Sequence, residues 1–432
     1  MKRALGQIEF ALLVASQFVG LWGVQGMVAA SPSTALNPLT PANNTAAFSG
    51  WVNQIDSAGL MEHVDALAHC GSRHVSSGND AEDWGIGVAR RYIHDQFIQL
   101  AETSAAVVES QEFFAPWRGV QSPMYNEIVT LPGTDATAGA IVIGAHYDSL
   151  NLQDQYGGAP GANDNASGVA TVLELARVMS ARPHRATLVF VAFSGEEIGR
   201  EGSLAFVNDY VPAHALDIRA MINLDVIGGS VSEHGAVNDT EIRLFSAAED
   251  NSGSQQLARS VQAYSSFYGA DLNVLMQDRL DRPGRYGDHQ SFSDAGYPAV
   301  RFISAVENTW HQHTVMDTVD DIDPAYLQRA ARTVLTVTLA LADGLPSPLQ
   351  ATLAQADGST SLTWQPVANA QSYVIAIRPV GSLTFDALYE VSAGATAATW
   401  TALELSNVAG AAVAARDVTG QIGLFSAEQR VT

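Results

Sequence analysis

Five short motifs that carry histidine or carboxylate side chains lie at, or one loop beyond, the ends of apolar stretches of strand length. They are His146-Tyr147-Asp148-Ser149, Gly161-Ala162-Asn163-Asp164-Asn165, Ser194-Gly195-Glu196-Glu197, Asp225 and His311-Gln312-His313. Imidazole nitrogen and carboxylate oxygen, without cysteine sulfur, form a donor set that suits zinc, with manganese or cobalt as substitutes. The motifs therefore indicate metal-dependent chemistry.

The candidate metal ligands are two histidines and three carboxylates, namely His146, Asp164, Glu197, Asp225 and His313. If one carboxylate is shared between two ions, each ion has three protein ligands and space for water. Two ions roughly 3.5–4 Å apart can activate that water and polarise the carbonyl of a scissile bond. We therefore predict a site for two Zn²⁺ ions.

Two further carboxylates next to these ligands have candidate catalytic roles. Glu196 immediately precedes Glu197, and neighbouring residues in a turn can point in different directions. A carboxylate that faces the water is a natural general base. Asp148, two residues after His146, is placed to hold the second imidazole nitrogen and to orient the ring.

Each of these residues also has an ordinary structural explanation. Asp164 or Asn165 could cap the helix that follows. Glu196 and Glu197 could be favoured by the dipole at a helix N-terminus. Asp225 could be a turn residue, and either histidine could be a hydrogen-bonded polar side chain. The coincidence of five motifs at strand ends favours a common site.

The elements that must position the motifs alternate between strand-length apolar runs and helix-period segments. The expected strands are Asn126–Leu131, Ala140–Ala145, Thr187–Phe193, Ala220–Leu224 and Ala299–Ile303. Their nearly continuous apolar character is typical of strands covered on both faces. We predict a three-layer α/β/α domain over residues 47–345, with a mostly parallel mixed sheet. Its strands would bring the motifs to one edge, because ligands bind at the carboxyl ends of such strands.

A second domain is expected over residues 346–432, after the proline-bearing segment that ends at Pro348. Short alternating stretches at Ser361–Trp364, Tyr373–Arg378 and Ala411–Arg416 predict an all-β sandwich. The pattern from Leu362 to Arg378 resembles a fibronectin type III domain. We expect this domain to fold independently and to be dispensable for the chemistry, because it contains none of the candidate site residues.

The N-terminus has the pattern of an export signal. Lys2 and Arg3 precede an apolar stretch from about Phe10 to Val24, and small residues precede Ser31. We predict a signal peptide over residues 1–30, a linker over 31–46, and a periplasmic or extracellular protein without a membrane span in the mature chain. The alternative is an uncleaved anchor, but polar residues interrupt a run shorter than the roughly 20 residues that a span needs.

Charge and cysteine content argue against a nucleic-acid-binding protein and against a small domain held together by disulfides. The formal net charge of −23 opposes binding to phosphate backbones, so no nucleic-acid partner is expected. Cys70 is the single cysteine, so the chain cannot form an intramolecular disulfide and depends on its core for stability.

Taken in order, the motifs resemble the bacterial leucyl aminopeptidase family of co-catalytic di-zinc peptidases over about residues 50–345. The matching stretches begin at His146, Gly161, Glu196, Asn223 and His313, and the last runs to Thr318. The resemblance implies that Asp164 bridges both zinc ions. It further implies that His146 and Asp225 complete the ligands of one ion and that Glu197 and His313 complete those of the other. The resemblance also makes Glu196 the general base. Asp148 would be the carboxylate that supports His146. The implied activity is removal of N-terminal residues from peptides.

The resemblance leaves alternatives open. Arg285-Tyr-Gly-Asp288-His289 lacks the cysteine pair that the leucyl enzymes carry there, so a preference for leucine is not implied. A glutaminyl cyclase, a carboxypeptidase or dipeptidase, and an inactive binding protein share the fold. We further predict that Arg285 binds a substrate carbonyl or carboxylate and that Glu307 binds the α-ammonium group or a basic side chain, with a solvated loop of mixed charge as the alternative.

Overall fold

A computed structural model describes residues 36–39, 45–79, 82–117, 120–246, 252–279, 281, 286–401, 405 and 407–431. The predicted signal peptide at residues 1–30 lies outside these ranges, as does most of the predicted linker. Within them, no helix combines the length and the hydropathy that crossing a bilayer requires.

In the described part of the chain, eight strands form one mixed sheet in the order β2-β3-β5-β4-β6-β9-β7-β8. Their bounds are β2 (Val107–Trp117), β3 (Val120–Leu131), β4 (Ala140–His146), β5 (Thr187–Phe193), β6 (Ile218–Leu224), β7 (Glu241–Ser246), β8 (Asn273–Met276) and β9 (Ala299–Ser304). The central strands β5, β4, β6 and β9 are parallel to one another, and β7 is parallel to β8. The antiparallel pairs are β2 with β3, β3 with β5, and β7 with β9. The predicted mixed, mostly parallel core is confirmed, and each predicted strand lies within an observed one.

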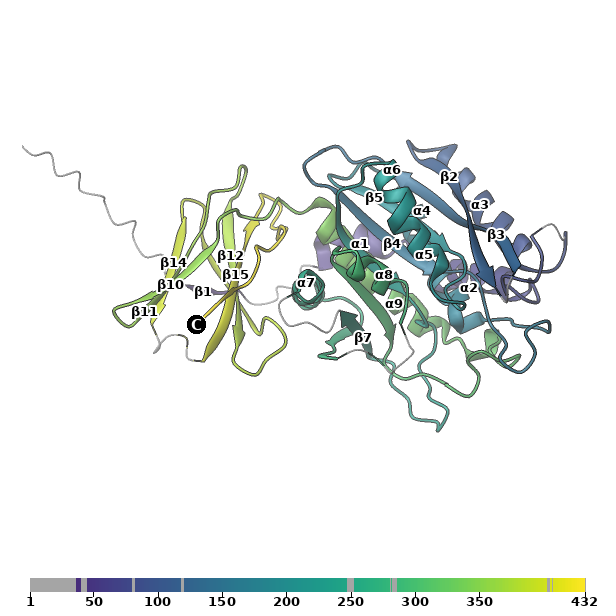
Figure 1. Ribbon diagram of the computed structural model, residues 1–432. Helices are drawn as coiled ribbons and strands as arrows, with labels where there is room; N and C mark the ends of the chain where they lie inside the picture. The colour runs from purple at the N-terminus through teal and green to yellow at the C-terminus, as the bar shows by residue number, and fades with distance from the viewer. Residues whose placement is uncertain are drawn as a thin grey trace, which may run out of the picture. The chain divides into compact units, whose positions relative to one another are not determined.

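Helices cover both faces of this sheet (Figure 1). One face carries α1 (Thr45–Val52), α2 (Ser57–Ala68), α3 (Ile86–Ala101), α4 (Ser167–Met179), α7 (Gly253–Tyr268) and α9 (Pro324–Asp343). The other carries α5 (Glu201–Ala205), the short turn η2 (Phe206–Tyr210), α6 (Val211–Ala213) and α8 (His289–Asp294). The predicted three-layer α/β/α architecture is therefore confirmed.

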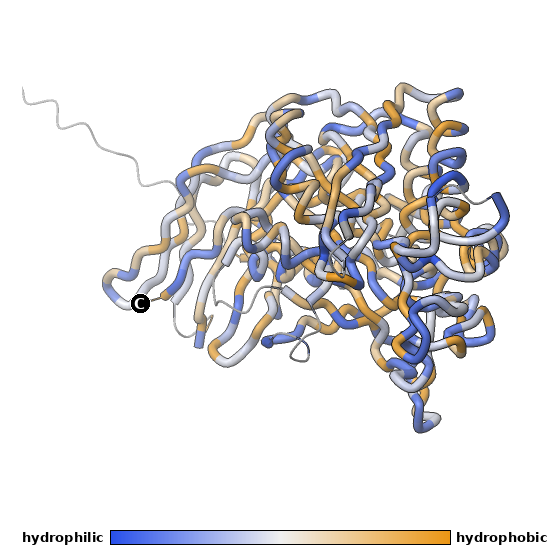
Figure 2. Tube along the Cα trace, turned by 45° about the vertical axis from the view of Figure 1, so that its right-hand side comes forward, coloured by the Kyte–Doolittle hydropathy of each residue, from blue (hydrophilic) through white to orange (hydrophobic). Residues whose placement is uncertain are grey.

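Alternation along each strand divides the core into two layers. On β5, Leu188 and Phe190 pack into the larger cluster with α4 and α9, whereas Val189 and Val191 pack into the smaller cluster with η2. Successive strand side chains point to opposite faces, so an apolar strand of this kind must be covered twice. Figure 2 shows hydrophobic segments (orange) concentrated inside this domain and hydrophilic segments (blue) at its periphery.

Helix starts follow local capping rules. The Asp56 side chain accepts the N–H of Gly59 at the start of α2, and Ser252 accepts that of Gln255 at the start of α7. Asp323 caps α9, where Pro324 occupies the first turn and loses no hydrogen bond. Polar caps of this type satisfy the free N–H groups of the first helical turn.

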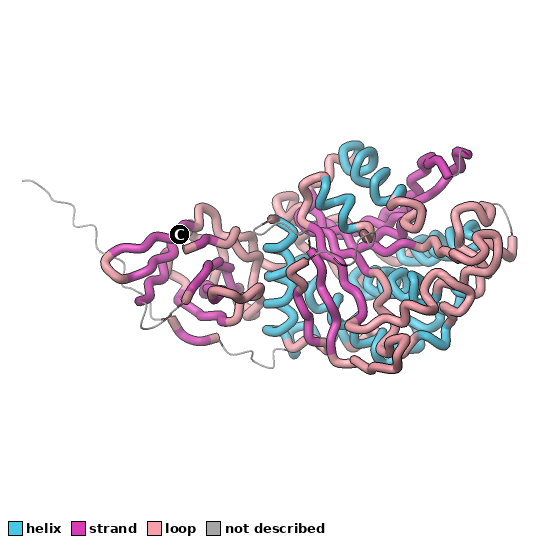
Figure 3. The backbone as a smooth tube through the Cα atoms, turned by 60° about the horizontal axis from the view of Figure 1, so that its bottom comes forward, coloured by secondary structure: helices cyan, strands magenta, loops and turns pink. Residues whose placement is uncertain are grey.

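The C-terminal region contains strands without helices among its described residues (Figure 3). One antiparallel sheet has the order β10 (Thr352–Ala356), β11 (Ser359–Thr363), β14 (Ala397–Thr401). The other has the order β1 (Asn37–Pro38), β13 (Ala387–Ser392), β12 (Ser372–Pro379), β15 (Val408–Arg416), β16 (Gln429–Arg430). Trp364, Tyr373 and Trp400 are buried in one cluster of this region. The predicted separate all-β region is thus observed.

Two features of this region differ from the expectations. Part of the predicted linker is strand β1, because Asn37 and Pro38 pair antiparallel with Glu390 and Tyr389 of β13. The all-β region also shares a core with the α/β domain: Ile422 lies in the same apolar cluster as the α7 and α9 side chains. Both regions belong to one compact unit, Ser33–Thr432, and these apolar contacts join them.

Candidate metal centre

The parallel strands bring the five predicted ligands together at the carboxyl edge of the sheet. His146 is the last residue of β4, Glu197 lies in the turn after β5, and Asp225 directly follows β6. His313 lies in the loop after β9, and Asp164 lies in the short turn η1 (Ala162–Ala166) that precedes α4. The predicted convergence therefore follows from sheet topology.

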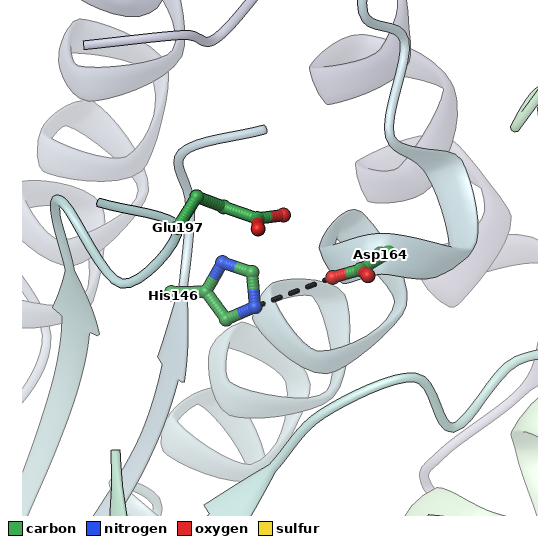
Figure 4. A group of neighbouring side chains, drawn as sticks. All are labelled: His146, Asp164 and Glu197. Carbon is green, nitrogen blue, oxygen red and sulfur yellow. Dashed lines mark ion pairs between the residues drawn. The ribbon is translucent and has the colours of Figure 1, made fainter. Parts of the chain in front are cut away.

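Asp164 lies between the two histidines. Its Oδ1 is 3.4 Å from Nε2 of His146, and its Oδ2 is 3.2 Å from Nε2 of His313. In Figure 4 the side chains of His146, Asp164 and Glu197 point toward a common space, and their potential ligand atoms lie within 4.8 Å of one another. One carboxylate thus offers a separate oxygen to each half of the site.

Each half of the site has one further carboxylate. Asp225 Oδ1 is 3.4 Å from Nε2 of His146, and Glu197 Oε2 is 3.1 Å from Nε2 of His313. The two groups are therefore His146 with Asp164 and Asp225, and His313 with Asp164 and Glu197. This grouping is the one that the family resemblance implied.

The chemistry of these side chains fits divalent cations. Oε1 of Glu197 is buried and has no hydrogen-bond partner among the described residues, so it is free to accept a positive ligand. Buried carboxylates require a compensating charge, which a cation supplies. His146 supplies it in part: burial lowers its pKa, but Asp148, Asp164 and Asp225 together raise that pKa well above the usual value.

Glu196 occupies a partly buried position beside the ligands. Burial raises the pKa of its carboxyl group well above the ordinary value, and Asp288, Asp225 and Glu197 add to the increase through their negative charge. His146 opposes the increase. A raised pKa makes a carboxylate a stronger proton acceptor, which a general base requires.

Comparisons with known proteins agree with this geometry. Residues 126–338 match the model of a family described as peptidase family M28. The chain is 32% identical over 338 residues to a protein of Pyrenophora tritici-repentis (strain Pt-1C-BFP) named "Probable zinc metalloprotease". That match covers 69% of this chain and 76% of the relative. The chain belongs to peptidase family M28.

Solved structures support the fold of the M28 chain. The LapA aminopeptidase of Legionella pneumophila aligns with a TM-score of 0.54 and 22% identity, covering 70% of this chain and 76% of that one. A glutaminyl cyclase from an Acidobacteriales bacterium aligns with a TM-score of 0.53 and 22% identity, covering 67% and 95%. The fold is thus shared by an aminopeptidase and a glutaminyl cyclase, so similarity of fold does not decide between these two activities.

Asp148 positions the glutamate pair of the M28 chain. Its two carboxylate oxygens accept the backbone N–H groups of Glu196 and Glu197, each at 3.1 Å. Its main-chain carbonyl oxygen is 3.1 Å from Nδ1 of His146, whereas its carboxylate is 3.6 Å from that nitrogen. Asp148 therefore lies behind His146, as predicted, but its carboxylate mainly holds the turn after β5.

Two positioning residues carried no predicted role. Asp317 accepts the backbone N–H groups of Asn163 and Asp164, at 2.8 and 2.9 Å, and so holds the turn that presents Asp164. Arg73 is fully buried and donates to the carbonyl oxygens of Tyr147 at 2.7 Å and Gly161 at 2.8 Å. The available sequence signals were the position of Asp317 in the family-like stretch that begins at His313 and, for Arg73, a further stretch from Ser72 to Gly78 that resembles the N-terminal region of the same family.

A cavity of about 340 Å³ adjoins the metal centre. Besides the five ligands and Glu196, its wall contains Leu150, Leu152, Gly199, Arg200, Tyr286 and Arg301. The loops that carry Leu152 and His313 are joined by a hydrogen bond from the Leu152 N–H to the His313 carbonyl, at 2.9 Å. None of these additional wall residues was predicted from the sequence, because their motifs carry no characteristic spacing.

The predicted substrate-binding residues, Arg285 and Glu307, are not seen in the cavity wall among the described residues. Arg285 lies outside the described residues. Glu307 is 7% exposed and is absent from the cavity wall; it accepts Arg243 Nη2 at 2.5 Å and Gln312 Nε2 at 3.0 Å. Because both carboxylate oxygens have partners in the protein, this arrangement gives no support to the predicted contact between Glu307 and an α-ammonium group.

Proposed function

We propose that this M28 chain is an exported aminopeptidase that uses two zinc ions to hydrolyse N-terminal residues from peptides. The observation that carries the proposal is the position of Asp164, with one oxygen toward His146 and the other toward His313. Each oxygen of Asp164 thus faces its own group of candidate ligands, and this supports a site for two ions.

The roles of the residues follow from this arrangement. His146 and Asp225 would hold one ion, His313 and Glu197 the other, and Asp164 both. When bound, the ions supply Lewis acidity toward the scissile carbonyl and lower the pKa of water. Glu196 accepts a proton from the attacking water and passes it to the leaving amine.

The size and charge of the cavity support action at a peptide N-terminus. Its volume of about 340 Å³ lies at the lower end of the roughly 300–1,000 Å³ typical of small-molecule sites. Such a space suits a terminal residue better than an internal segment. Among the carboxylates of the described cavity wall, Glu196 belongs to neither ligand group, so it can accept an α-ammonium group. The similarity to an enzyme named LapA aminopeptidase agrees with this assignment.

The proposal also includes export of the chain and the type of its C-terminal region. Export rests on the basic and apolar N-terminal pattern, with cleavage ahead of Ser31 and release to the periplasm or the medium. We also infer that residues 346–432 form a fibronectin type III-like module. Its support is one sheet of β10, β11 and β14 opposite a second sheet in which β13, β12, β15 and β16 are consecutive neighbours.

Substrate profiling of the purified full chain tests the function. Zinc-restored protein should hydrolyse aminoacyl-anilides and unblocked peptides, should spare N-acetylated peptides, and should contain two zinc equivalents. Chelation should abolish the activity, and zinc should restore it. Cyclisation of an N-terminal glutamine peptide without hydrolysis would identify a glutaminyl cyclase. Release of C-terminal residues would identify a carboxypeptidase, and zinc retention without turnover of any substrate a binding protein.

A further inference from the structure

Two arginines line the cavity beside the metal centre, and they differ in how their charges are used. Arg301 is 3% exposed, and its guanidinium group pairs with Asp225 at 3.1 Å and with Asp281 at 3.6 Å. It is therefore engaged in holding a ligand carboxylate. Arg200 has one ion-pair contact among the described residues, in which its Nη1 is 3.8 Å from Asp294 Oδ2.

The contact between Arg200 and Asp294 leaves the guanidinium group available. A separation of 3.8 Å is too long for a hydrogen bond, and the Asp294 side chain is 57% exposed to solvent. Nη1 of Arg200 is itself buried and has no hydrogen-bond partner among the described residues. The Arg200 side chain as a whole is 21% exposed and lines the cavity, so other parts of the guanidinium group can offer N–H donors to a ligand there.

The backbone holds Arg200 next to the general base candidate. The N–H groups of Gly199 and Arg200 both donate to the Glu196 carbonyl oxygen, at 3.0 and 2.9 Å. Arg200 has a φ of 65°, in the left-handed region that residues other than glycine rarely adopt. This conformation places a long cationic side chain at the point where the chain turns away from Glu196 and enters α5.

The Tyr286 ring adds a second wall at the same place. Its centroid is 5.9 Å from the Arg200 guanidinium carbon, and both side chains line the cavity. An aromatic face at this distance favours the cation and restricts its positions. The planar, two-pronged guanidinium group is the side chain that best matches a carboxylate.

The negative charge around the cavity explains why a cation would help to bind a substrate carboxylate there. Glu196 and the ligand carboxylates line the same space, and the chain carries a net charge of −23. Two bound zinc ions would offset the carboxylates at the centre, so a substrate carboxylate would be repelled mainly by the rest of the acidic chain, and a cation that faces it would reduce that repulsion. Of the two arginines in the described cavity wall, Arg301 lies 3.1 Å from Asp225, whereas the ion-pair contact of Arg200 is 3.8 Å long and more exposed.

We propose that Arg200 binds a carboxylate group of the substrate that lies close to the scissile bond. This carboxylate is either the C-terminus of a dipeptide or an acidic side chain next to the cleaved bond. The inference rests on the proposed aminopeptidase function and names the substrate class that the same site prefers.

The test compares substrates in pairs that differ by one negative charge. One pair is a dipeptide and its C-terminal amide, and the other is a glutamyl-anilide and a glutaminyl-anilide. The Arg200→Gln variant should raise KM for the charged member of a pair about ten- to a hundred-fold more than for its neutral partner. Arg200→Lys should retain part of the preference. Arg219→Gln, a matched change at an exposed position on β6, should leave the ratio of the two KM values within each substrate pair unchanged.

The pattern of the loss identifies the source of the carboxylate. A change confined to the dipeptide pair assigns Arg200 to the C-terminal carboxylate, and a change confined to the anilide pair assigns it to the acidic side chain. Equal KM changes within both pairs would overturn the inference and leave Arg200 as a partner of Asp294.

A second measurement avoids dependence on turnover. In the Glu196→Gln background, calorimetry should show that the dipeptide binds with a lower Kd than the dipeptide amide. Adding Arg200→Gln should remove this ratio of Kd values. An unchanged ratio would also overturn the inference. Hydrolysis of the neutral substrates by the wild-type chain tests the aminopeptidase proposal separately, because those substrates do not depend on Arg200 for recognition.

Discussion

The Asp148 carboxylate accepts the backbone N–H of Glu196 at 3.1 Å. The two residues lie 48 positions apart, one after β4 and the other after β5, and the parallel pairing of those strands makes them neighbours. The same carboxylate accepts the N–H of Glu197. One side chain therefore sets the orientation of both the general base candidate and a ligand.

Asp148→Asn should lower activity by about ten- to a hundred-fold and weaken metal retention, because an amide group offers only one oxygen for two N–H donors. The measurements are kcat and zinc content after dialysis against a weak chelator. Asp95→Asn, at an exposed position on α3, is the matched control. Wild-type activity and zinc content in the Asp148 variant would show that the turn after β5 holds its shape without this carboxylate.

Glu196→Gln should lower kcat by about 10²–10⁴-fold while both metal ions remain bound, because Glu196 belongs to neither ligand group. Kinetics and metal analysis on the same preparation check both parts. Glu102→Gln, at an exposed residue after α3, should behave as the wild-type chain. If the Glu196 variant loses one metal equivalent, the roles of Glu196 and Glu197 are exchanged.

Glu174 should make a pH-dependent contribution to stability through its contacts on α4. Burial raises its pKa, but Arg177, which binds both carboxylate oxygens at 2.7 and 2.8 Å, and His63 lower it to about 2 from 4.5. A depressed pKa stabilises the folded state above the unfolded value, and this contribution disappears as pH falls from about 5 to about 2.

Glu174→Gln should therefore destabilise the protein by on the order of 3 kcal/mol at pH 7 and by progressively less as the pH is lowered through that window. Denaturant unfolding at a series of pH values measures the difference. Glu62→Gln, an exposed change on α2, provides the baseline. A difference between wild type and Glu174→Gln that is constant with pH would show that the ion pair does not stabilise the fold.

Glu428→Gln should destabilise the chain by about 3–5 kcal/mol, because it leaves the buried guanidinium of Arg259 without its carboxylate. The Arg259 and Glu428 side chains are 1% and 0% exposed and lie 2.9 Å apart, and Glu428 also accepts Arg378 at 2.6 Å. Glu390→Gln removes a partly exposed partner of Arg416 and should cost less than about 1 kcal/mol. Melting temperatures of the two variants compare the pairs directly.

The same contacts change the expectation for a chain that ends near residue 345. Such a chain keeps every ligand but loses the carboxylate that faces Arg259 and the carbonyl of Gly423 that accepts the Tyr264 hydroxyl at 2.8 Å. It should melt well below the full chain. A melting temperature equal to that of the full chain would support the independent fold expected from the sequence.

The sequence by itself determined the candidate ligands and the sheet that carries them. Apolar strands covered on both faces leave a continuous hydrophobic signal, and the residues that follow them must meet at one edge when the strands are parallel. This reasoning places His146, Glu197 and Asp225 at one edge, because each lies at a strand end or in the turn that follows it.

Only the tertiary structure decided which other side chains face the site. Glu307 precedes His313 by six residues, yet its carboxylate pairs with Arg243 and Gln312. Arg200 lies in the family-like stretch that begins at Glu196 but had no predicted role, yet a left-handed turn brings its guanidinium group into the cavity wall. Likewise, the pair between Arg259 and Glu428 joins residues 169 positions apart. Side-chain direction and long-range pairing depend on how packed elements meet, and local spacing carries no information about either.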